Sequence, residues 1–270
     1  MQATLTGQNR TGATASPQGT QAMTDAVNEL TPPVPIDTAG LEAERLLYID
    51  ASDTVGSIPP PLGMDGMVKS GMARLKGANP SVLMDKVGER IAFERTGVRL
   101  YEALLAKYEA ATRRGGDVLP PAGDVQEVAE AQGLAVLAPV QDEAPVQTLQ
   151  RIRSEELAHF RLLCDAMAQL GGDPTAQTPC ADVTATASIG IMQVVTDPRT
   201  TLAQCLNAIL TVELTDNAGW ELLVQLAEQA GESELAGRFL GALAQEQEHL
   251  VTIKGWLTTL LTRGAGTPAV

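Results

Sequence analysis

The sequence predicts an all-α protein. Aromatic residues make up only 3% of its 270 residues, whereas alanine, leucine and valine are abundant. This composition suits packed helices better than β-sheets, which favour aromatic and β-branched side chains. Four long segments also place apolar residues at helical spacing, which is the main sequence signal of amphipathic helices.

Breaker residues set the expected limits of these four helices. A Gly-Gly pair ends the first two, and Asp197 and Pro198 are expected as the N-cap and first helical residue of the third. Ser233 is expected as the N-cap of the fourth. The four expected segments are 81–114, 145–170, 198–231 and 233–263.

The connections between the helices differ in length. Residues 115–144 form a long connection with an expected short helix at 124–132, and residues 171–196 form a second long connection. The last link is short, which predicts that the third and fourth helices are antiparallel neighbours.

The rest of the chain divides by composition. Residues 1–40 are rich in Thr, Gly, Ala, Gln and Pro and are predicted to be disordered or loosely ordered. Residues 41–80 are expected to form a short helical extension that packs on the bundle. Residues 81–263 form the predicted helical domain, and residues 264–270 form a tail.

Charge and cysteine content exclude several classes of protein. A formal net charge of -14 argues against nucleic acid and anionic membranes as main partners. The three cysteines are an odd number without CxxC spacing, which argues against a disulfide framework. Neither a signal segment nor an apolar run of about 18 residues is present, so we expect a cytoplasmic protein with no membrane partner.

The two histidines carry the functional signal. His159 follows Glu156 by three residues, and His249 follows Glu246 by three, so each pair lies on one helical face. The apolar stripes of the four helices are interrupted in a single layer. That layer contains four glutamates and both histidines: Glu94, Glu156, His159, Glu213, Glu246 and His249.

An internal repeat relates the two halves of this layer. "FERTGVRLYEAL" aligns with "VELTDNAGWELL", which places Glu94 on Glu213 and Tyr101 on Trp220. Unpaired carboxylates in a packed core cost several kcal/mol or become protonated. Two divalent cations would balance four carboxylates. In the alternative interpretation, Glu156 and Glu246 are solvated surface residues and the histidines are satisfied within the core.

This pattern resembles the ferritin-like carboxylate proteins, in which two helices supply one Glu each and two others supply Glu-x-x-His. The resemblance covers residues 81–263 and implies a ferritin-like four-helix bundle with two metal ions. It implies Glu94 and Glu213 as terminal ligands, and Glu156 and Glu246 as bridging ligands. One histidine would serve each metal.

Several neighbours of this layer have two possible roles. Tyr101 and Trp220 could hydrogen-bond a ligand carboxylate or relay single electrons, or they could only fill the core. Asp216 could accept a histidine N–H or be an exposed helix carboxylate. Glu248 is expected to be solvated, and Cys164 and Cys205 are expected to be buried packing residues.

The resemblance also implies a function. Glu and His donors suit iron first and manganese second. We expect a ferroxidase- or peroxidase-like di-iron oxidoreductase of the oxidative-stress type that reacts with dioxygen or hydrogen peroxide. Its electrons would come from ferrous iron or from a separate donor protein. A dimanganese catalase and a non-catalytic metal-binding protein are the alternatives. Only "RGAGTPAV" follows the last helix, so we expect no storage cage, and a homodimer is expected.

Overall fold

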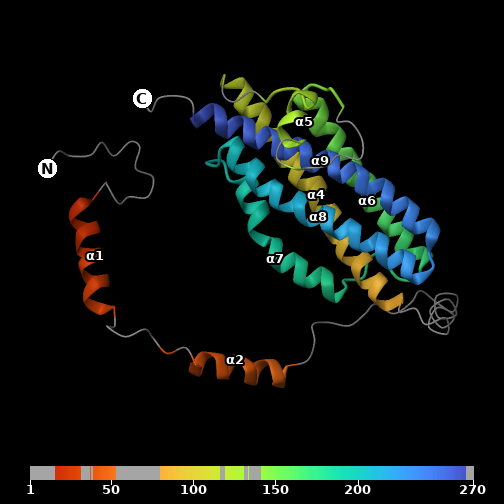
Figure 1. Cartoon of the computed structure of the whole chain (residues 1–270), viewed down its shortest axis with the longest axis horizontal. Helices are drawn as coiled ribbons and strands as arrows, with labels where there is room; N and C mark the ends of the chain where they lie inside the picture. Colours follow the sequence, from red (N-terminus) through yellow and green to blue (C-terminus); the bar gives the residue numbers. More distant parts are fainter. Residues whose placement is uncertain are drawn as a thin grey trace. The chain divides into compact units, whose positions relative to one another are not determined.

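In the computed structural model, the described residues are 16–31, 37, 39–52, 80–115, 119–130, 133 and 141–265. All regular secondary structure in these ranges is helical, which confirms the all-α prediction. None of the helices in these ranges has the length and apolar character needed to cross a bilayer. The helices are α1 (Pro17–Leu30), α2 (Ala39–Ala51), α4 (Pro80–Arg113), α5 (Gly123–Glu130), α6 (Pro145–Gln169), α7 (Pro179–Thr196), α8 (Leu202–Ala230) and α9 (Ser233–Ala265) (Figure 1).

Four long helices, α4, α6, α8 and α9, pack around a shared core. Helix α4 contacts α6 and α8, and helix α9 contacts the same two helices from the other side. Helices α8 and α9 run side by side, as the short link between them predicts (Figure 1). The four predicted segments therefore form the centre of the domain, with limits close to those expected.

The core consists of two apolar clusters. On each of the four helices, residues of one cluster precede the layer of glutamates and histidines, and residues of the other follow it. The polar layer therefore lies between two apolar regions, which keep water away from it. One cluster includes Leu100, Leu149, Ile209 and Ile253, and the other includes Val87, Leu163, Leu223 and Phe239.

The third long helix begins later than predicted. Helix α8 starts at Leu202, and its N-cap is Thr201, whose side chain accepts from the backbone N–H of Gln204 while the Gln204 side chain accepts from the N–H of Thr201. This reciprocal capping satisfies two backbone donors at once. Asp197 instead ends helix α7, and Pro198 lies in the turn that follows.

The connection 171–196 contains a helix that the sequence analysis missed. Helix α7 begins after Thr178, whose side chain accepts from the backbone N–H of Ala181, and packs against α4 and α8. Only Ala181 and Val195 are buried along its length. A helix that buries so little has no apolar stripe to identify it, and its threonines, serine and glycine are weak helix formers.

The smaller predicted helix in the connection 115–144 is present as α5, which packs against α9. Trp256 of α9 donates from its indole N–H to the carbonyl of Pro120, 2.8 Å away. This contact anchors the beginning of the connection on the outer side of α9. The prediction of a short helix near 124–132 is therefore confirmed.

The N-terminal region forms a separate compact unit, residues 1–54. Within residues 1–40, which the composition predicts to be disordered or loosely ordered, Pro17–Leu30 is helical, and Ser16 caps the helix by accepting from the N–H of Gly19. No residue of α1 or α2 is buried. The packing of 41–80 on the domain stays a prediction, because residues 53–79 lie outside the described ranges, as does most of the predicted tail.

Candidate metal centre

The six predicted ligands meet in one buried layer. Glu94 comes from α4, Glu156 and His159 from α6, Glu213 from α8, and Glu246 and His249 from α9. Each of these residues is at most 2% exposed. The alternative interpretation, in which Glu156 and Glu246 are solvated, is therefore wrong.

The two histidines face the same carboxylate. Nδ1 of His159 lies 2.7 Å from Oε1 of Glu246, and Nδ1 of His249 lies 3.3 Å from Oε2 of Glu246. Glu94 also approaches His159, with 3.6 Å between Oε2 and Nδ1. Glu156 approaches His249, with 3.5 Å between Oε1 and Nδ1. Glu246 thus lies between two similar groups of side chains.

The outer nitrogen of each histidine is held by a side chain from the other half of the layer. Nε2 of His159 lies 2.8 Å from the amide oxygen of Gln245, and Nε2 of His249 lies 2.8 Å from a carboxylate oxygen of Glu155. Because both acceptors need a donor, each Nε2 carries the proton. Each Nδ1 then faces the carboxylates and, when it carries no proton, can offer its lone pair to a metal ion.

Six atoms of this layer are buried and have no hydrogen-bond partner among the described residues. Nδ1 of His159 and Oε1 of Glu246 lie 2.7 Å apart and form an ion pair when the imidazole is protonated. Lone pairs that face one another in an apolar core require a cation or protons between them. The six atoms are Glu94 Oε2, His159 Nδ1, Glu213 Oε2, both carboxylate oxygens of Glu246, and His249 Nδ1.

The donor atoms fall into groups that could hold metal ions. The ligand atoms of Glu94, His159 and Glu246 all lie within 4.8 Å of one another, and so do those of Glu156, Glu246 and His249. A third group joins Asp216 to Glu94, Glu156 and Glu246. The buried Glu, His and Asp side chains can therefore hold a metal ion.

The pKa values show the same need for positive charge. Burial and the charges of Glu246 and Glu94 raise the pKa of Glu156 well above its usual value. Burial and the charge of Glu246 raise the pKa of Glu213 to about 8. Burial alone would lower the pKa of His159, but the carboxylates of Glu246 and Glu94 raise it well above normal. In the metal-free protein, protons therefore occupy positions suited to cations.

Tyr101 and Trp220 each donate a hydrogen bond to the glutamate of the opposite half. The Tyr101 hydroxyl donates to Oε1 of Glu213 at 2.5 Å, and the Trp220 indole N–H donates to Oε1 of Glu94 at 2.9 Å. These are the hydrogen bonds to ligand carboxylates that one interpretation predicted. Burial and the charges of Glu213 and Glu156 raise the pKa of Tyr101, so its proton stays on the phenol. A role in electron relay stays a prediction.

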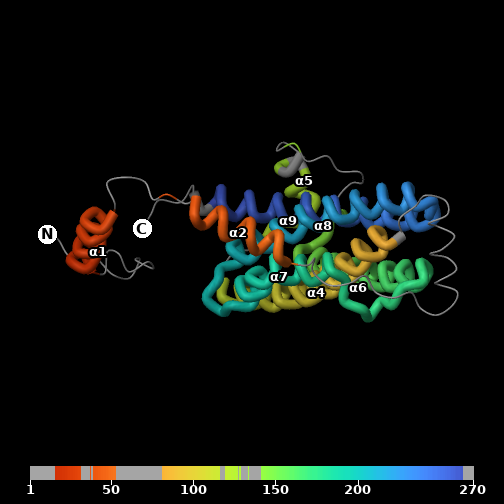
Figure 2. Tube along the Cα trace, turned by 90° about the horizontal axis from the view of Figure 1, so that it is seen from below, coloured from red at the N-terminus to blue at the C-terminus, as the bar shows by residue number. Residues whose placement is uncertain are grey.

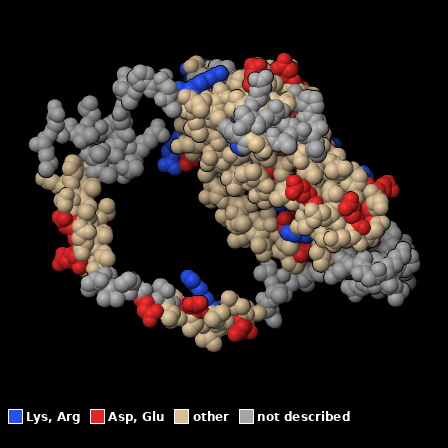
Figure 3. Space-filling model, in the orientation of Figure 1, with Lys and Arg blue, Asp and Glu red and all other residues tan. Residues whose placement is uncertain are grey.

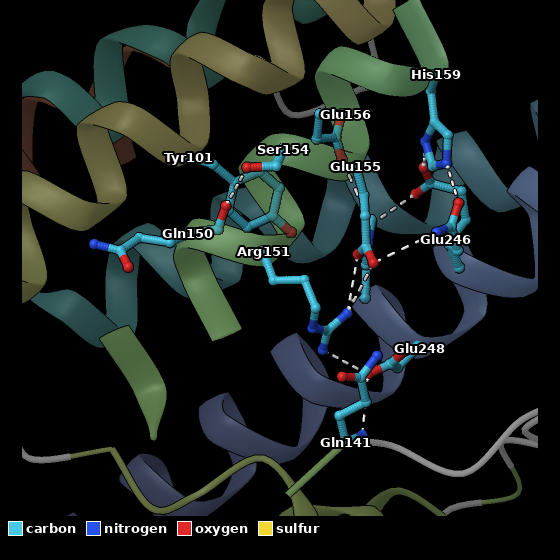
Figure 4. A network of polar contacts seen from close by, with 12 residues as sticks. Tyr101, Gln141, Gln150, Arg151, Ser154, Glu155, Glu156, His159, Glu246 and Glu248 are labelled. Carbon is cyan, nitrogen blue, oxygen red and sulfur yellow. Dashed lines mark hydrogen bonds and ion pairs between the residues drawn. The ribbon is translucent and has the colours of Figure 1, made fainter. Parts of the chain in front are cut away.

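Glu155, which binds His249, belongs to a polar network that Figure 4 shows running through Arg151 to Glu248 and Gln141. Arg151 donates to both carboxylate oxygens of Glu155, at 3.2 and 2.9 Å, and to Glu248 at 2.6 Å. The backbone N–H of Gln141 also donates to Glu248. Glu248 is 6% exposed, so the prediction that it is solvated is wrong. Its charge is compensated by Arg151.

Asp216 also differs from both of its predicted roles. It is buried, and it accepts from Nη1 of Arg90 at 2.6 Å rather than from a histidine. Arg90 stacks on the ring of Phe93, 3.9 Å from its centroid. Among the cysteines, Cys205 is buried as predicted, whereas Cys164 is only half-buried.

Sequence reasoning missed the partners of the two histidines. Glu155 precedes Glu156, Gln245 precedes Glu246, and each binds the histidine of the other half. The repeated position before each Glu-x-x-His glutamate could have identified them. Gly97 was also missed as a constraint, because a Cβ at this position would overlap Oε2 of Glu156.

Comparisons of the chain with protein-family models, curated proteins and solved structures found no significant match. The function is therefore inferred from the geometry and chemistry of the residues themselves.

Proposed function

We propose that residues 81–263 form a ferritin-like four-helix bundle that holds two metal ions, iron first and manganese second. We further propose that it reacts with dioxygen or peroxide as a ferroxidase- or peroxidase-like oxidoreductase. The observation that carries the proposal is the convergence of six buried, unpartnered donor atoms from four helices. A core whose only role was packing would not bring together buried polar atoms that lack hydrogen-bond partners.

The arrangement of donors supports two metal positions. Glu94 and His159 would serve one ion, and Glu156 and His249 would serve the other. Glu246 has one oxygen toward each histidine, which suits a ligand shared by both ions. Glu213 has one oxygen bound to Tyr101 and the other unpartnered and buried. When bound, two ferrous ions would supply electrons for the reduction of dioxygen or peroxide.

The protein side chains would prepare and protect this centre. Gln245 and Glu155 hold the histidines with their Nδ1 lone pairs inward. Trp220 fixes one oxygen of Glu94, and Tyr101 keeps its phenolic proton and donates it to Oε1 of Glu213, with 2.5 Å between the two oxygens. The apolar clusters on both sides exclude water, which strengthens every electrostatic interaction in the layer.

Metal analysis of protein purified without added metal tests the binding part of the proposal. We expect two iron ions per chain, or two after anaerobic reconstitution with ferrous iron. Protein that retains neither iron nor manganese after reconstitution would contradict the metal centre.

Consumption assays test the reaction. The iron-loaded protein is expected to consume dioxygen or hydrogen peroxide repeatedly when ferrous iron or another reductant is supplied. Manganese-loaded protein that disproportionates peroxide without a reductant would identify a catalase instead. Stoichiometric metal with no consumption of either oxidant would leave a metal-binding protein and contradict the oxidoreductase.

A further inference from the structure

A groove runs between helices α4 and α7, which lie side by side (Figures 1 and 2). One end is a hollow of about 110 Å³, and the adjoining hollow measures about 410 Å³. Both hollows have Ala92, Arg95 and Ala185 in their walls, so they meet at these residues. The smaller hollow has an apolar interior, formed by Phe93, Leu100, Ile191, Met192 and Val212.

Two polar side chains in the walls of the smaller hollow donate hydrogen bonds within their own helices, whereas one cation in the walls has no such partner among the described residues. Thr96 donates to the carbonyl of Ala92, and Ser188 donates to the carbonyl of Thr184, both within their own helices. Arg95 is the one charged residue in the described walls of both hollows. Within the described ranges, its guanidinium makes no hydrogen bond or ion pair. A cation at the junction of two hollows, one of them apolar, is suited to an anionic group attached to an apolar chain.

The outer wall of the groove favours an apolar ligand as well. Helix α7 has no charged residue from Val183 to Thr196. Figure 3 shows a broad area without charged side chains over α7 and the adjacent part of α8. Small residues of α7, such as Ala185 and Ser188, leave the space that a narrow chain needs. The described walls of the two hollows contain one cation, Arg95, and not the basic patch that a negatively charged macromolecule would need.

We propose that this groove binds a single-chain amphiphile with a carboxylate head, of the fatty-acid type. The carboxylate would bind the guanidinium of Arg95, and the alkyl chain would enter the apolar hollow and continue along the groove between α4 and α7. Each methylene that leaves water for the groove adds to the binding affinity. The apolar chain therefore supplies affinity, while Arg95 supplies selectivity for the head group.

The position of the hollow connects this ligand to the metal layer. Phe93 and Val212 form part of its wall and directly precede Glu94 and Glu213 of the layer, and Leu100 of the wall precedes Tyr101, which binds Glu213. The hollow is therefore lined by the same turns of α4 and α8 that carry the candidate centre. The binding proposal itself does not depend on metal, so it can fail or succeed independently of the proposed oxidoreductase function.

Displacement of a fluorescent fatty acid by dodecanoate, measured on the full-length protein as purified, tests the head group. Arg95→Gln is expected to weaken dodecanoate binding about tenfold or more, because it removes a charge-assisted interaction. Binding of uncharged dodecanol should change little. Arg99→Gln is the matched control, because Arg99 is an exposed arginine of the same helix, as Arg95 is, but lies outside the described walls of both hollows. Equal dodecanoate affinity in wild type and Arg95→Gln would overturn the assignment of the head group.

A second pair of variants tests the position of the alkyl chain. Ala185→Leu should fill the junction of the hollows and abolish binding, whereas Ala187→Leu, at an exposed position of α7 outside the walls, should leave it intact. Equal binding by both variants would overturn the proposal. So would binding that occurs only on anionic phospholipid vesicles and never with monomeric dodecanoate, since the ligand would then be a membrane surface.

Discussion

The two halves of the metal layer, α4 with α6 and α8 with α9, have matching ligands but different supporting residues. Each half supplies a glutamate, an aromatic residue seven positions later, and a Glu-x-x-His. In each half, two side chains form hydrogen bonds with ligands of the opposite half. They are the aromatic residue and the residue that precedes the Glu-x-x-His. Neither half can therefore hold its own ligands in place, and the centre exists only when both halves are assembled.

The difference between the halves lies in the acceptors of the histidine protons. His249 donates to the carboxylate of Glu155, which Arg151 holds with two hydrogen bonds. His159 donates to the neutral amide of Gln245. A charged acceptor makes an imidazole more basic and a stronger donor to a metal than a neutral one does. Two positions with matching ligands are therefore expected to bind metal with unequal strength.

The largest effect is expected from the residue that both halves share. Glu246→Ala should remove metal from both positions, because Glu246 faces both histidines. Glu94→Ala should spare the ion on the His249 side. Metal content after reconstitution measures both effects, and Glu221→Ala, an exposed carboxylate of α8, is the control. Retention of both ions by Glu246→Ala would contradict the shared role.

Metal removal should make stability depend strongly on pH. The folded-state pKa of Glu213 is about 8, against a usual 4.5, so from about pH 5 to 8 the unfolded chain loses a proton that the folded chain keeps. Stability of the metal-free protein therefore falls across this window, by several kcal/mol in total. The raised pKa values of the histidines act in the same direction above pH 6.5. Glu246, whose pKa is lowered, is ionised in both states here.

Thermal melting at pH 5.5 and pH 8 measures this effect. The metal-loaded protein is expected to behave oppositely, because metal competes with protons for the ligands and binds more tightly as pH rises. The difference in Tm between loaded and metal-free protein should thus widen toward pH 8. A metal-free Tm that is constant or rises between these pH values would be inconsistent with the ligand set.

Exchange of the histidine acceptors should sharpen the comparison between the halves. Glu155→Gln should weaken metal binding at the His249 position about 10- to 100-fold, as loss of such partners typically does. Gln245→Glu should strengthen binding at the His159 position. Stepwise titration with ferrous iron under anaerobic conditions measures both affinities. If Glu155→Gln affected the two ions equally, the acceptors would not be the source of the inequality.

The smallest effects are expected from the aromatic donors. Tyr101→Phe and Trp220→Phe each remove one hydrogen bond to a buried carboxylate, which costs about 1–3 kcal/mol in stability. The metal-free protein should lose more from Tyr101→Phe at pH 8 than at pH 5.5, because Glu213, whose pKa is about 8, is partly ionised at pH 8 and protonated at pH 5.5. Chemical denaturation at both pH values measures this. Tyr108→Phe, outside the layer, serves as the control.

The ligands could be predicted from the sequence because each one interrupts an apolar stripe on its own helix. Their partners could not, because those contacts cross between helices. Asp216 binds Arg90 rather than a histidine, and Glu248 is buried against Arg151, since the rotations of neighbouring helices decide which side chains meet. Helix α7 was missed because it buries almost nothing, and helix α8 begins at Leu202 because Thr201 and Gln204 cap each other's backbone N–H there.

The tight turn between α8 and α9 has a consequence for the order of folding. Gly231 ends α8 in a left-handed conformation with φ of 79°, and α9 begins two residues later. Asn217 then joins the helices by donating to the backbone carbonyls of Glu213 and Glu246, at 2.9 and 3.0 Å. Loop-closure entropy is small for such a hairpin and larger for the pairing of α4 with α6 across residues 114–144. We therefore expect the α8–α9 hairpin to form first and to act as the template on which the other half of the layer assembles.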